Sequence, residues 1–311
     1  MSLLSIQGVS VDLPMTGLFA RRRLNILSDI SFELAAGETL GLVGESGSGK
    51  TTLARAVLGL QRISAGTLTL SGTQLKTKDD FRNIRRSAAM MFQDAVASLS
   101  PRMTVGQLIA EPFAIHSVAL PTGKIADLLA QVGLPPDIST RYPHELSGGQ
   151  ARRVGVARAL ALHPKLVIAD EPTAGLDVSV QAEILNLMSD LKDDLNLSYL
   201  IISHNLALVR HVADRTIVMY LGRLVETGPT AQVFAAPRHP YTASLIAADP
   251  KPDPRQRRAD LAIKGEIPSI LRRPAGCEFH TRCPQAQSLC RTIAPQLVEK
   301  SHGHSARCHY S

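Results

Sequence analysis

The chain has 311 residues, 44% of them hydrophobic and 20% charged, and a formal net charge of +7. This is an ordinary globular composition, with enough residues for one large domain or two modest ones. No run approaches the roughly 20 apolar residues that a membrane-spanning helix needs, and the start of the chain lacks the pattern of a secretory signal. We therefore expect a cytosolic chain, whose mostly scattered basic residues do not by themselves indicate nucleic acid.

The N-terminal part predicts β-structure followed by a glycine-rich loop. Residues 3–13 and 30–34 are apolar segments of strand length, separated by a basic insertion. Residues 39–43, TLGLV, predict a strand, and the sequence from Thr51 onward has helical spacing. Between this strand and this helix lies GESGSGKT, residues 44–51, so that strand, glycine-rich loop and helix follow one another.

GESGSGKT fits the phosphate-loop pattern G-x-x-x-x-G-K-S/T. Its glycines let the backbone curl so that successive N–H groups point at phosphate oxygens, and the start of the helix adds its positive end. We expect Lys50 to reach the terminal phosphates, Thr51 to bind Mg²⁺ and Thr52 to bond another phosphate oxygen. The alternative is a glycine-rich turn with an incidental lysine. The predicted phosphate-binding residues are Gly44, Ser46, Gly47, Ser48, Gly49, Lys50, Thr51 and Thr52.

The central part of the chain predicts an inserted helical region and then two buried strands. Between residues 92 and 158, helical patterns are interrupted by several prolines. Residues 166–170 (LVIAD) and 199–203 (YLIIS) are continuous apolar runs of the kind found in buried parallel strands. An amphipathic helix is predicted between them, over residues 178–195.

An acidic pair, Asp170 and Glu171, stands at the end of the first of these strands. Ligands gather at the carboxyl ends of parallel strands, so Asp170 can hold Mg²⁺ directly or through water. Glu171 can orient and polarise a water molecule for attack on a γ-phosphate. The alternative is a solvated acidic pair at a strand end.

The motif LSGGQ, residues 146–150, directly precedes a predicted helix whose N terminus can bind an anion. The chain therefore carries a second candidate phosphate site, which indicates that two chains meet head to tail. At this point the sequence resembles the ATPase subunits of ABC transporters over nearly its whole length. Gln93 in MMFQD resembles the Q-loop glutamine of that family, Asp177 in AGLD its D-loop aspartate, and His204 in IISHN its switch histidine.

This resemblance implies an α/β fold: a P-loop NTPase (ABC ATPase) core with an N-terminal antiparallel β region, an inserted helical subdomain and a C-terminal Cys-containing extension. It also implies ATP sandwiched in a dimer, between the phosphate loop of one chain and the signature residues of the other. Glu171 would be the catalytic carboxylate, His204 would contact the γ-phosphate, and Gln93 would link Mg²⁺ to the region facing the membrane subunits. Taken alone, His204 is equally explained as a capping or core histidine. The signature residues are Ser147, Gly148, Gly149 and Gln150.

The sequence departs from the usual family pattern near these motifs. Ala151 follows the signature motif where a polar residue is common, and Ala174 stands where the D-loop commonly has a serine that contacts the other chain. The aromatic residue that stacks on adenine is predicted to be Phe19, the only aromatic residue between Val11 and Ser31. Arg21 to Arg23 lie nearby in the sequence as cation partners.

The C-terminal segments 238–250 and 265–291 resemble the extension found in ATPase subunits of oligopeptide and dipeptide importers, a group with nickel and antimicrobial-peptide relatives. All four cysteines lie in this part, and in a cytosolic chain such clustering favours metal over disulfides. Their wide spacing lacks C-x2-C pairs, which favours a four-iron, four-sulfur (4Fe-4S) cluster over tetrahedral Zn²⁺. Mixed ligation by His280, His302, His304 or His309 is also open, and unligated thiols are the alternative. The cysteines are Cys277, Cys283, Cys290 and Cys308.

We therefore predict an ATPase subunit that powers binding-protein-dependent import of di- or oligopeptides, with ATP and Mg²⁺ as cofactors. Its predicted domains are residues 1–235, with a helical subdomain at about 92–158, and residues 236–311. The expected partners are a second ATPase subunit, two membrane permeases and, indirectly, an extracytoplasmic solute-binding protein, without nucleic acid. The chain would lie peripherally on the cytoplasmic face of the bacterial inner membrane. The alternatives are import of nickel or another small solute, and a soluble ABC ATPase acting on ribosomes or nucleic acid.

Overall fold

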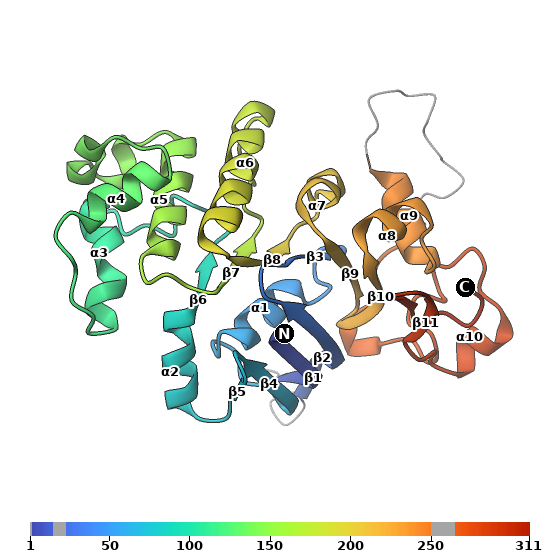
Figure 1. The fold of residues 1–311 in the computed structure, drawn as a ribbon. Coiled ribbons are helices and arrows are strands. Elements are labelled where there is room, and N and C mark those ends of the chain that lie inside the picture. The colour runs from blue at the N-terminus through green and yellow to red at the C-terminus, as the bar shows by residue number, and fades with distance from the viewer. Residues whose placement is uncertain (1, 15–22, 250–264) are drawn as a thin grey trace. The chain divides into compact units, whose positions relative to one another are not determined.

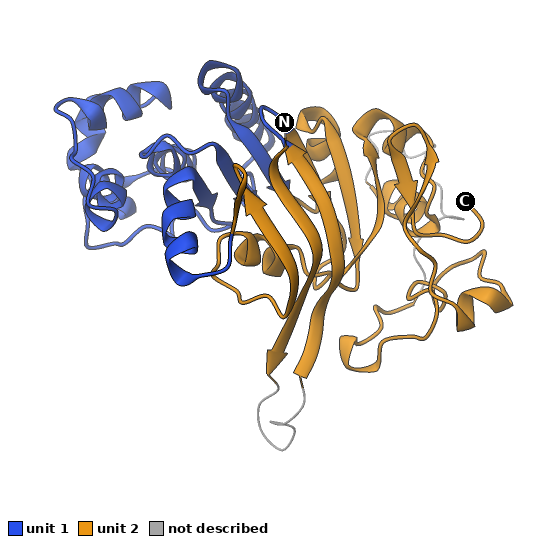
Figure 2. Ribbon diagram, turned by 60° about the horizontal axis from the view of Figure 1, so that its bottom comes forward, with its two compact units in different colours: residues 1, 35–38, 75–202 blue, residues 2–34, 39–74, 203–311 orange. Residues whose placement is uncertain are grey.

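A computed structural model describes residues 2–14, 23–249 and 265–311 (Figure 1). The chain divides into two compact units (Figure 2): unit 1 comprises residues 35–38 and 75–202, and unit 2 comprises residues 2–34, 39–74 and 203–311. Within the described ranges, no helix has both the length and the apolar character needed to span a membrane.

Unit 2 begins with an antiparallel sheet in the strand order β2-β1-β4-β5. Buried apolar residues alternate along the first strand, and the alternation changes phase where the register against β4 shifts between Gln7 and Ser10. The predicted antiparallel β region is therefore confirmed, although β2 is longer than the expected strand at 30–34. The strands are β1 (Ser2–Pro14), β2 (Arg23–Ala35), β4 (Ala65–Leu70) and β5 (Thr73–Gln74).

A second sheet of unit 2 carries the glycine-rich loop. β3 (Thr39–Val43) pairs in parallel with β9 (Arg215–Tyr220), which pairs antiparallel with β10 (Arg223–Pro229). Every residue of β3 is buried, as its continuous apolar composition predicts. The loop after β3 leads directly into α1 (Lys50–Val57), so the predicted order of strand, loop and helix is confirmed.

The C-terminal part of the chain continues this sheet beyond β10 (Figure 1). β12 (His304–Ala306) pairs antiparallel with β10, and β11 (Val298–Ser301) pairs antiparallel with β12. The tail is therefore joined to the strands beside the loop by main-chain hydrogen bonds. The other helices of unit 2 are α7 (Leu206–Val212), α8 (Thr230–Ala235), α9 (Pro240–Ala248), α10 (Ser288–Thr292) and a 3-10 turn at Ile270–Arg272.

A buried carboxylate ties three segments of unit 2 together. Glu226 on β10 accepts hydrogen bonds from the backbone N–H groups of Arg238 and His239, at 2.7 and 2.8 Å. Its carboxylate also lies 2.7 Å from Nε2 of His304 on β12. The side chains of Glu226 and His304 are 0% and 1% exposed, so these polar groups depend on one another for hydrogen bonds.

Unit 1 contains a parallel sheet in the order β6-β7-β8. The strands are β6 (Ala88–Met91), β7 (Leu166–Asp170) and β8 (Ser198–Ile202). β7 has the predicted bounds, and β8 begins and ends one residue earlier than predicted. The helix between them, α6 (Val178–Leu195), also has the predicted bounds, because Asp177 caps its start and Asn196 ends it in the left-handed conformation.

The middle of unit 1 is helical, as its sequence pattern predicts. Leu108 and Ile109 of α3, Leu128 of α4 and Val154 of α5 are fully buried. Arg158 on α5 pairs with Glu111 on α3 at 2.6 Å, which holds these two helices together at their half-buried edge. The elements are α2 (Lys78–Ser87), α3 (Val105–Ile115), α4 (Lys124–Gln131), α5 (Gly148–Leu160) and 3-10 turns at Pro136–Thr140 and Pro143–Glu145.

We predict that Glu226→Ala destabilises the protein strongly, because it leaves two backbone N–H groups and the His304 imidazole without their acceptor in the interior. The expected loss is about 3 kcal/mol of unfolding free energy. Urea denaturation followed by circular dichroism measures it as a lower unfolding midpoint. The exposed Glu266 provides the matched control, Glu266→Ala. Equal midpoints for the two variants would contradict this role of Glu226.

Candidate functional site

At two positions, the backbone of the glycine-rich loop of unit 2 could not accommodate a side chain. Gly44 and Gly49 have φ angles of 151° and 102°. A Cβ atom on Gly44 would lie 2.3 Å from the carbonyl oxygen of Met219, and one on Gly49 would lie 2.7 Å from Leu27. Gly49 is also the N-cap of α1 and contributes no side chain there, so the helix start is left for an anion.

Lys50 lies back along the loop. Its Nζ donates to the carbonyl oxygens of Gly44 and Glu45, at 2.6 and 2.9 Å, and lies 3.4 Å from the Ser48 hydroxyl. Lys50 and Ser48 are 8% and 3% exposed, whereas Ser46 and Gly47 are exposed at the tip of the loop. The predicted lysine is therefore held in the loop by carbonyl groups, whose bonds it would exchange for bonds to phosphate.

His204 belongs to the same unit as the loop. The backbone N–H of Ser203 donates to the carbonyl of Leu42 at 3.2 Å, and Leu42 lies two residues before Gly44. Asn205 caps the start of α7 through its side chain, so the capping role proposed as the alternative for His204 is filled by its neighbour. The His204 side chain is exposed. This exposure favours a role at the surface over that of a core histidine.

In unit 1, the ends of β6 and β7 bring three predicted residues near one another. Met91 pairs with Ala169 in parallel register, so Gln93 follows β6 at the same end of the sheet where Asp170 ends β7 and Glu171 follows it. Asp170 is buried at 5% exposure. Glu171 has a φ of 51°, a conformation that is uncommon for a residue with a side chain. Such backbone conformations are frequent at functional sites, because the surrounding structure must hold them in place.

The LSGGQ motif forms the start of α5. Ser147 is its N-cap and accepts from the Gln150 N–H at 3.2 Å, while the Gln150 side chain accepts from the Ser147 N–H at 3.0 Å. A Cβ atom on Gly149 would lie 3.1 Å from Val180 on α6. Gly149 therefore permits close packing of α5 on the start of α6. Ser147 and Gly148 remain exposed.

Asp177 caps α6 beside this motif. Its carboxylate accepts from the Ser179 hydroxyl at 2.6 Å and from the Val180 N–H at 3.0 Å. The hydrogen bond from Ser179 and then that from Val180 lower the pKa of Asp177, which stabilises the ionised form. The negative charge of the ionised carboxylate also interacts favourably with the positive end of the α6 helix dipole.

Arg152 connects these loops of unit 1. Its guanidinium donates to the carbonyl oxygens of Phe92, Gln93 and Ala174, at 2.9, 2.9 and 3.1 Å. The residue is 3% exposed, and burial lowers its pKa. One side chain on α5 therefore fixes the segment that carries Gln93 against the segment that leads to Asp177.

Two polar residues of these motifs are absent from the predicted site residues: Arg152 and Glu45. Arg152 could have been found because it lies four residues before the apolar Val156, and therefore on the same face of the helix. Glu45 could have been found because it is an acidic residue inside a loop suited to anions. Phe19, predicted to stack on adenine, lies outside the described residues.

All four cysteines line one small cavity in unit 2, together with His239, Phe279 and His280. The cavity measures about 20 Å³, the room of about one water molecule. Gly276, at a φ of 67°, allows the close backbone approach in which Cys277 N–H donates to the Cys290 carbonyl at 2.8 Å. Burial, with a smaller contribution from the other three thiols, raises the pKa of Cys277 to about 11. The Cys277 thiol is therefore protonated at neutral pH unless a cation stabilises its thiolate.

The prediction of an iron–sulfur cluster finds no support in the structure as it stands. Within residues 2–14, 23–249 and 265–311, no group of three or more His, Cys, Asp or Glu side chains is arranged to hold a metal ion. The donor set suits a thiolate-bound metal, but the cavity has room for one small ion, and a 4Fe-4S cluster would require the side chains to move apart.

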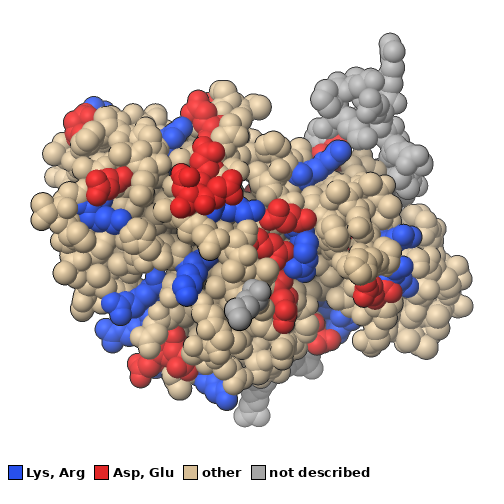
Figure 3. All heavy atoms as spheres, viewed as in Figure 1, with Lys and Arg blue, Asp and Glu red and all other residues tan. Residues whose placement is uncertain are grey.

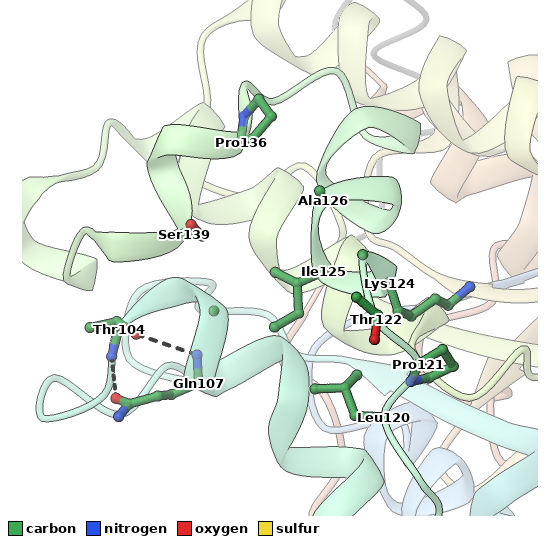
Figure 4. Close-up of a pocket in the computed structure, with 12 residues that line it drawn as sticks. Thr104, Gln107, Leu120, Pro121, Thr122, Lys124, Ile125, Ala126, Pro136 and Ser139 are labelled. Carbon is green, nitrogen blue, oxygen red and sulfur yellow. Dashed lines mark hydrogen bonds between the residues drawn. The ribbon is translucent and has the colours of Figure 1, made fainter.

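A larger hollow in unit 1, of about 600 Å³, lies away from the motifs (Figure 4). It is formed between the start of α3, the segment at residues 120–126 and the 3-10 turn at Pro136–Thr140. Thr104 and Gln107, which line it, are occupied by the reciprocal cap of α3. None of the predicted site residues lines this hollow.

The charged side chains are mixed on the face of the molecule shown in Figure 3. There, the described Lys and Arg side chains are interspersed with Asp and Glu rather than gathered into one basic area. That face therefore lacks, among the described residues, the continuous positive surface typical of nucleic-acid binding.

Comparison with known proteins places this arrangement in a family. The ABC transporter family matches residues 27–174, and the family described as the oligopeptide/dipeptide transporter C-terminal region matches residues 225–290. The chain is 45% identical, over 99% of its length, to the probable peptide ABC transporter ATP-binding protein y4tS of Sinorhizobium fredii, of which it covers 90%. It is 42% identical, over 99% of its length, to the oligopeptide transport ATP-binding protein AppF of Bacillus subtilis, of which it covers 97%.

A solved structure agrees with this likeness. The structure of cbiO1 from Clostridium perfringens, part of the ABC transporter complex cbiONQ, has a TM-score of 0.65 at 26% identity. The match covers 76% of this chain and 91% of that one. The chain therefore belongs to the ATP-binding subunits of the ABC transporter family. It is an ATPase whose hydrolysis of ATP is coupled to transport, and it carries the C-terminal region characteristic of the oligopeptide/dipeptide branch.

We predict that Arg152→Met slows ATP hydrolysis at least tenfold, because three loop carbonyls lose a charged donor worth roughly 1.5–3 kcal/mol per bond. Binding of a non-hydrolysable ATP analogue should change little, since the bonds of Arg152 lie within unit 1 and the phosphate loop belongs to unit 2. Steady-state phosphate release and equilibrium binding measure the two effects. The exposed Arg210 on α7 provides the control, Arg210→Met. Normal turnover in Arg152→Met would rule out this role.

Proposed function

We propose that the chain is the ATP-hydrolysing subunit of a binding-protein-dependent importer for di- or oligopeptides. The observation that carries this proposal is the match of residues 225–290 to the oligopeptide/dipeptide transporter C-terminal region. Relatives that cover nearly the whole chain are named for peptide transport, which supports the same substrate class.

In this proposal the loop of unit 2 binds ATP. Lys50 exchanges its bonds with the carbonyls of Gly44 and Glu45 for bonds to the β- and γ-phosphates, because a charged acceptor is the stronger partner. Thr51 and Asp170 hold Mg²⁺, with Gln93 completing its surroundings. The full set of ATP-binding residues is Gly44, Ser46, Gly47, Ser48, Gly49, Lys50, Thr51 and Thr52, with Phe19 at the adenine.

Hydrolysis is then phosphoryl transfer to water, in which positioning and electrostatics supply the catalysis. Glu171 accepts a proton from the attacking water. His204 contacts the γ-phosphate. Mg²⁺ held by Thr51 and Asp170 would supply positive charge beside the phosphate oxygens.

The exposed start of α5 is proposed as the half of the site that acts on the partner's nucleotide. Ser147, Gly148, Gly149 and Gln150 supply backbone N–H groups and the positive end of a helix to the γ-phosphate of ATP bound by the second ATPase subunit. Asp177 lies beside them in the D-loop. Each closed dimer would then contain two nucleotides, and hydrolysis would reopen it.

The proposed partners follow from this arrangement. A second ATPase subunit, identical or paralogous, completes the dimer. The dimer binds two permeases at the cytoplasmic face of the bacterial inner membrane. An extracytoplasmic binding protein selects the peptide and delivers it to the permeases. We also propose the division into an ATP-binding domain at residues 1–235, with a helical subdomain at about 92–158, and an extension at residues 236–311.

For the four thiols we propose a metal centre with a structural role. Cys277, Cys283, Cys290 and Cys308 come from three separate segments of the extension and line one cavity. A metal would supply charge that stabilises their thiolates, and it would join those segments to one another. A 4Fe-4S cluster and a Zn²⁺ ion are the two candidates.

We predict that Glu171→Gln slows phosphate release at least tenfold and leaves ATP bound, because a positioned general base contributes about 10²–10⁴ to rate. Asp190→Asn, an exposed acidic position on α6, is the control. Turnover equal to that of the control would remove Glu171 as the catalytic carboxylate.

The Glu171→Gln chain also tests the cargo. Tagged in its native cell and extracted gently with Mg-ATP, it should copurify with two multi-spanning permeases and a second ATPase. A binding protein encoded beside them, tested against peptides and against nickel, then distinguishes the substrates. Copurified ribosomes or nucleic acid without a permease would overturn the transport assignment.

We predict that the protein purified without oxygen contains iron with acid-labile sulfide, or zinc, in a fixed ratio to the chain. Cys283→Ser and Cys290→Ser should lose this metal, because each removes one of four ligands, whereas Ser288→Ala at the exposed start of α10 should retain it. Elemental analysis and the visible absorption spectrum separate the two metals. A chain with neither metal would show that the thiols are unligated.

A further inference from the structure

Glu45, the second residue of the phosphate loop, is held by the C-terminal extension. The two terminal nitrogens of Arg282 donate to the two carboxylate oxygens of Glu45, at 2.7 and 2.9 Å. The backbone N–H of Glu45 donates to the hydroxyl oxygen of Tyr241 at 2.8 Å. The side chains of Arg282 and Glu45 are 5% and 21% exposed, so this two-pronged pair is mostly removed from water. Such a pair fixes orientation far better than a single exposed ion pair does.

The residues that hold Glu45 are themselves fixed. Tyr220, Tyr241 and Phe279 form an aromatic cluster with ring centroids 4.7 to 5.3 Å apart, and each is at most 1% exposed. The guanidinium of Arg282 lies 5.9 Å from the centre of the Tyr220 ring. The backbone N–H of Arg282 donates to the Phe279 carbonyl at 2.9 Å. Glu45 raises the pKa of Arg282, which is therefore always charged. The contact thus rests on β9, α9 and the turn between Cys277 and Cys283.

These contacts bear on how the loop meets a phosphate. Lys50 now bonds the carbonyls of Gly44 and Glu45, and it must release them to reach a nucleotide. Arg282 and Tyr241 engage the side chain and the N–H of Glu45, which are different atoms, so they hold the first turn of the loop before and after Lys50 moves. A loop that keeps its shape when the ligand is absent loses less conformational entropy on binding.

We propose that Arg282 and Tyr241 are positioning residues for ATP, through which the C-terminal extension keeps the phosphate loop in its nucleotide-binding shape. ATP affinity then depends on a part of the chain that begins 196 residues beyond Glu45 in the sequence. The inference rests on the proposed assignment of Gly44 to Thr52 as the ATP site.

The test is ATP hydrolysis and equilibrium binding of a fluorescent, non-hydrolysable ATP analogue by the full-length chain carrying Arg282→Met. KM for ATP and the dissociation constant of the analogue should rise roughly 5- to 50-fold, the range expected for loss of a charge-assisted pair. The value of kcat should stay within about twofold, because a residue that only prepares the loop affects binding rather than the chemical step. Arg291→Met, an exposed arginine of α10 in the same extension, is the control.

Three further variants separate positioning from a general loss of structure. Tyr241→Phe keeps the packed ring and removes only the hydroxyl, and should raise KM by about two- to tenfold. Arg282→Lys restores a charge without the two-pronged geometry and should recover part of the affinity. The double variant Glu45→Gln, Arg282→Met should bind ATP no more weakly than the weaker-binding of the two single variants, because both substitutions remove the same interaction.

The outcomes divide as follows. The positioning role would be overturned by an unchanged KM in Arg282→Met and Tyr241→Phe, or by a fall in kcat at constant KM. It would also be overturned if the increase in KM of the double variant equalled the product of the two single increases. The ATPase assignment would stand in each case. A wild-type chain that binds no ATP would overturn the proposed site and this inference together.

Discussion

The phosphate loop can take its shape only because Gly44 and Gly49 have no side chains. Their surroundings leave no room for one, since the Met219 carbonyl and the Leu27 side chain occupy the positions that Cβ atoms would need. This constraint fixes where β3 ends and where α1 begins. Around it, unit 2 holds Lys50 against the loop carbonyls and, through the hydrogen bond from Ser203 to Leu42, holds the segment that carries His204.

The C-terminal extension shares this foundation. It enters the sheet of unit 2 through β12 and β10, is tied to that sheet by the buried Glu226, and reaches the loop itself at Glu45. An acidic residue in an anion-binding loop would ordinarily repel the ligand. Here its charge is paired with Arg282, so the loop gains a rigid attachment, and that charge is balanced before a nucleotide arrives.

In unit 1, a buried arginine, Arg152, holds two loop segments in place, as Arg282 does for the phosphate loop in unit 2. Gln93 and the D-loop lie in irregular segments, which by themselves would sample many conformations. Arg152 binds the carbonyls of both segments from the first turns of α5, directly after the LSGGQ motif. One side chain near the start of α5 therefore ties together the segments that carry Gln93 and the D-loop.

Local sequence determined the elements whose interactions are local. β3, β7 and α6 have their predicted bounds because continuous apolar runs specify buried strands and because Asp177 and Asn196 specify where a helix starts and stops. The motifs likewise identified the family and the kind of chemistry. Only the tertiary structure decided the pairing of β12 with β10, the cavity shared by the four cysteines and the contacts of Arg152 and Arg282. The strand pairing and the two arginine contacts join residues far apart in the chain, and no local propensity or spacing records which distant partner a buried charge will find.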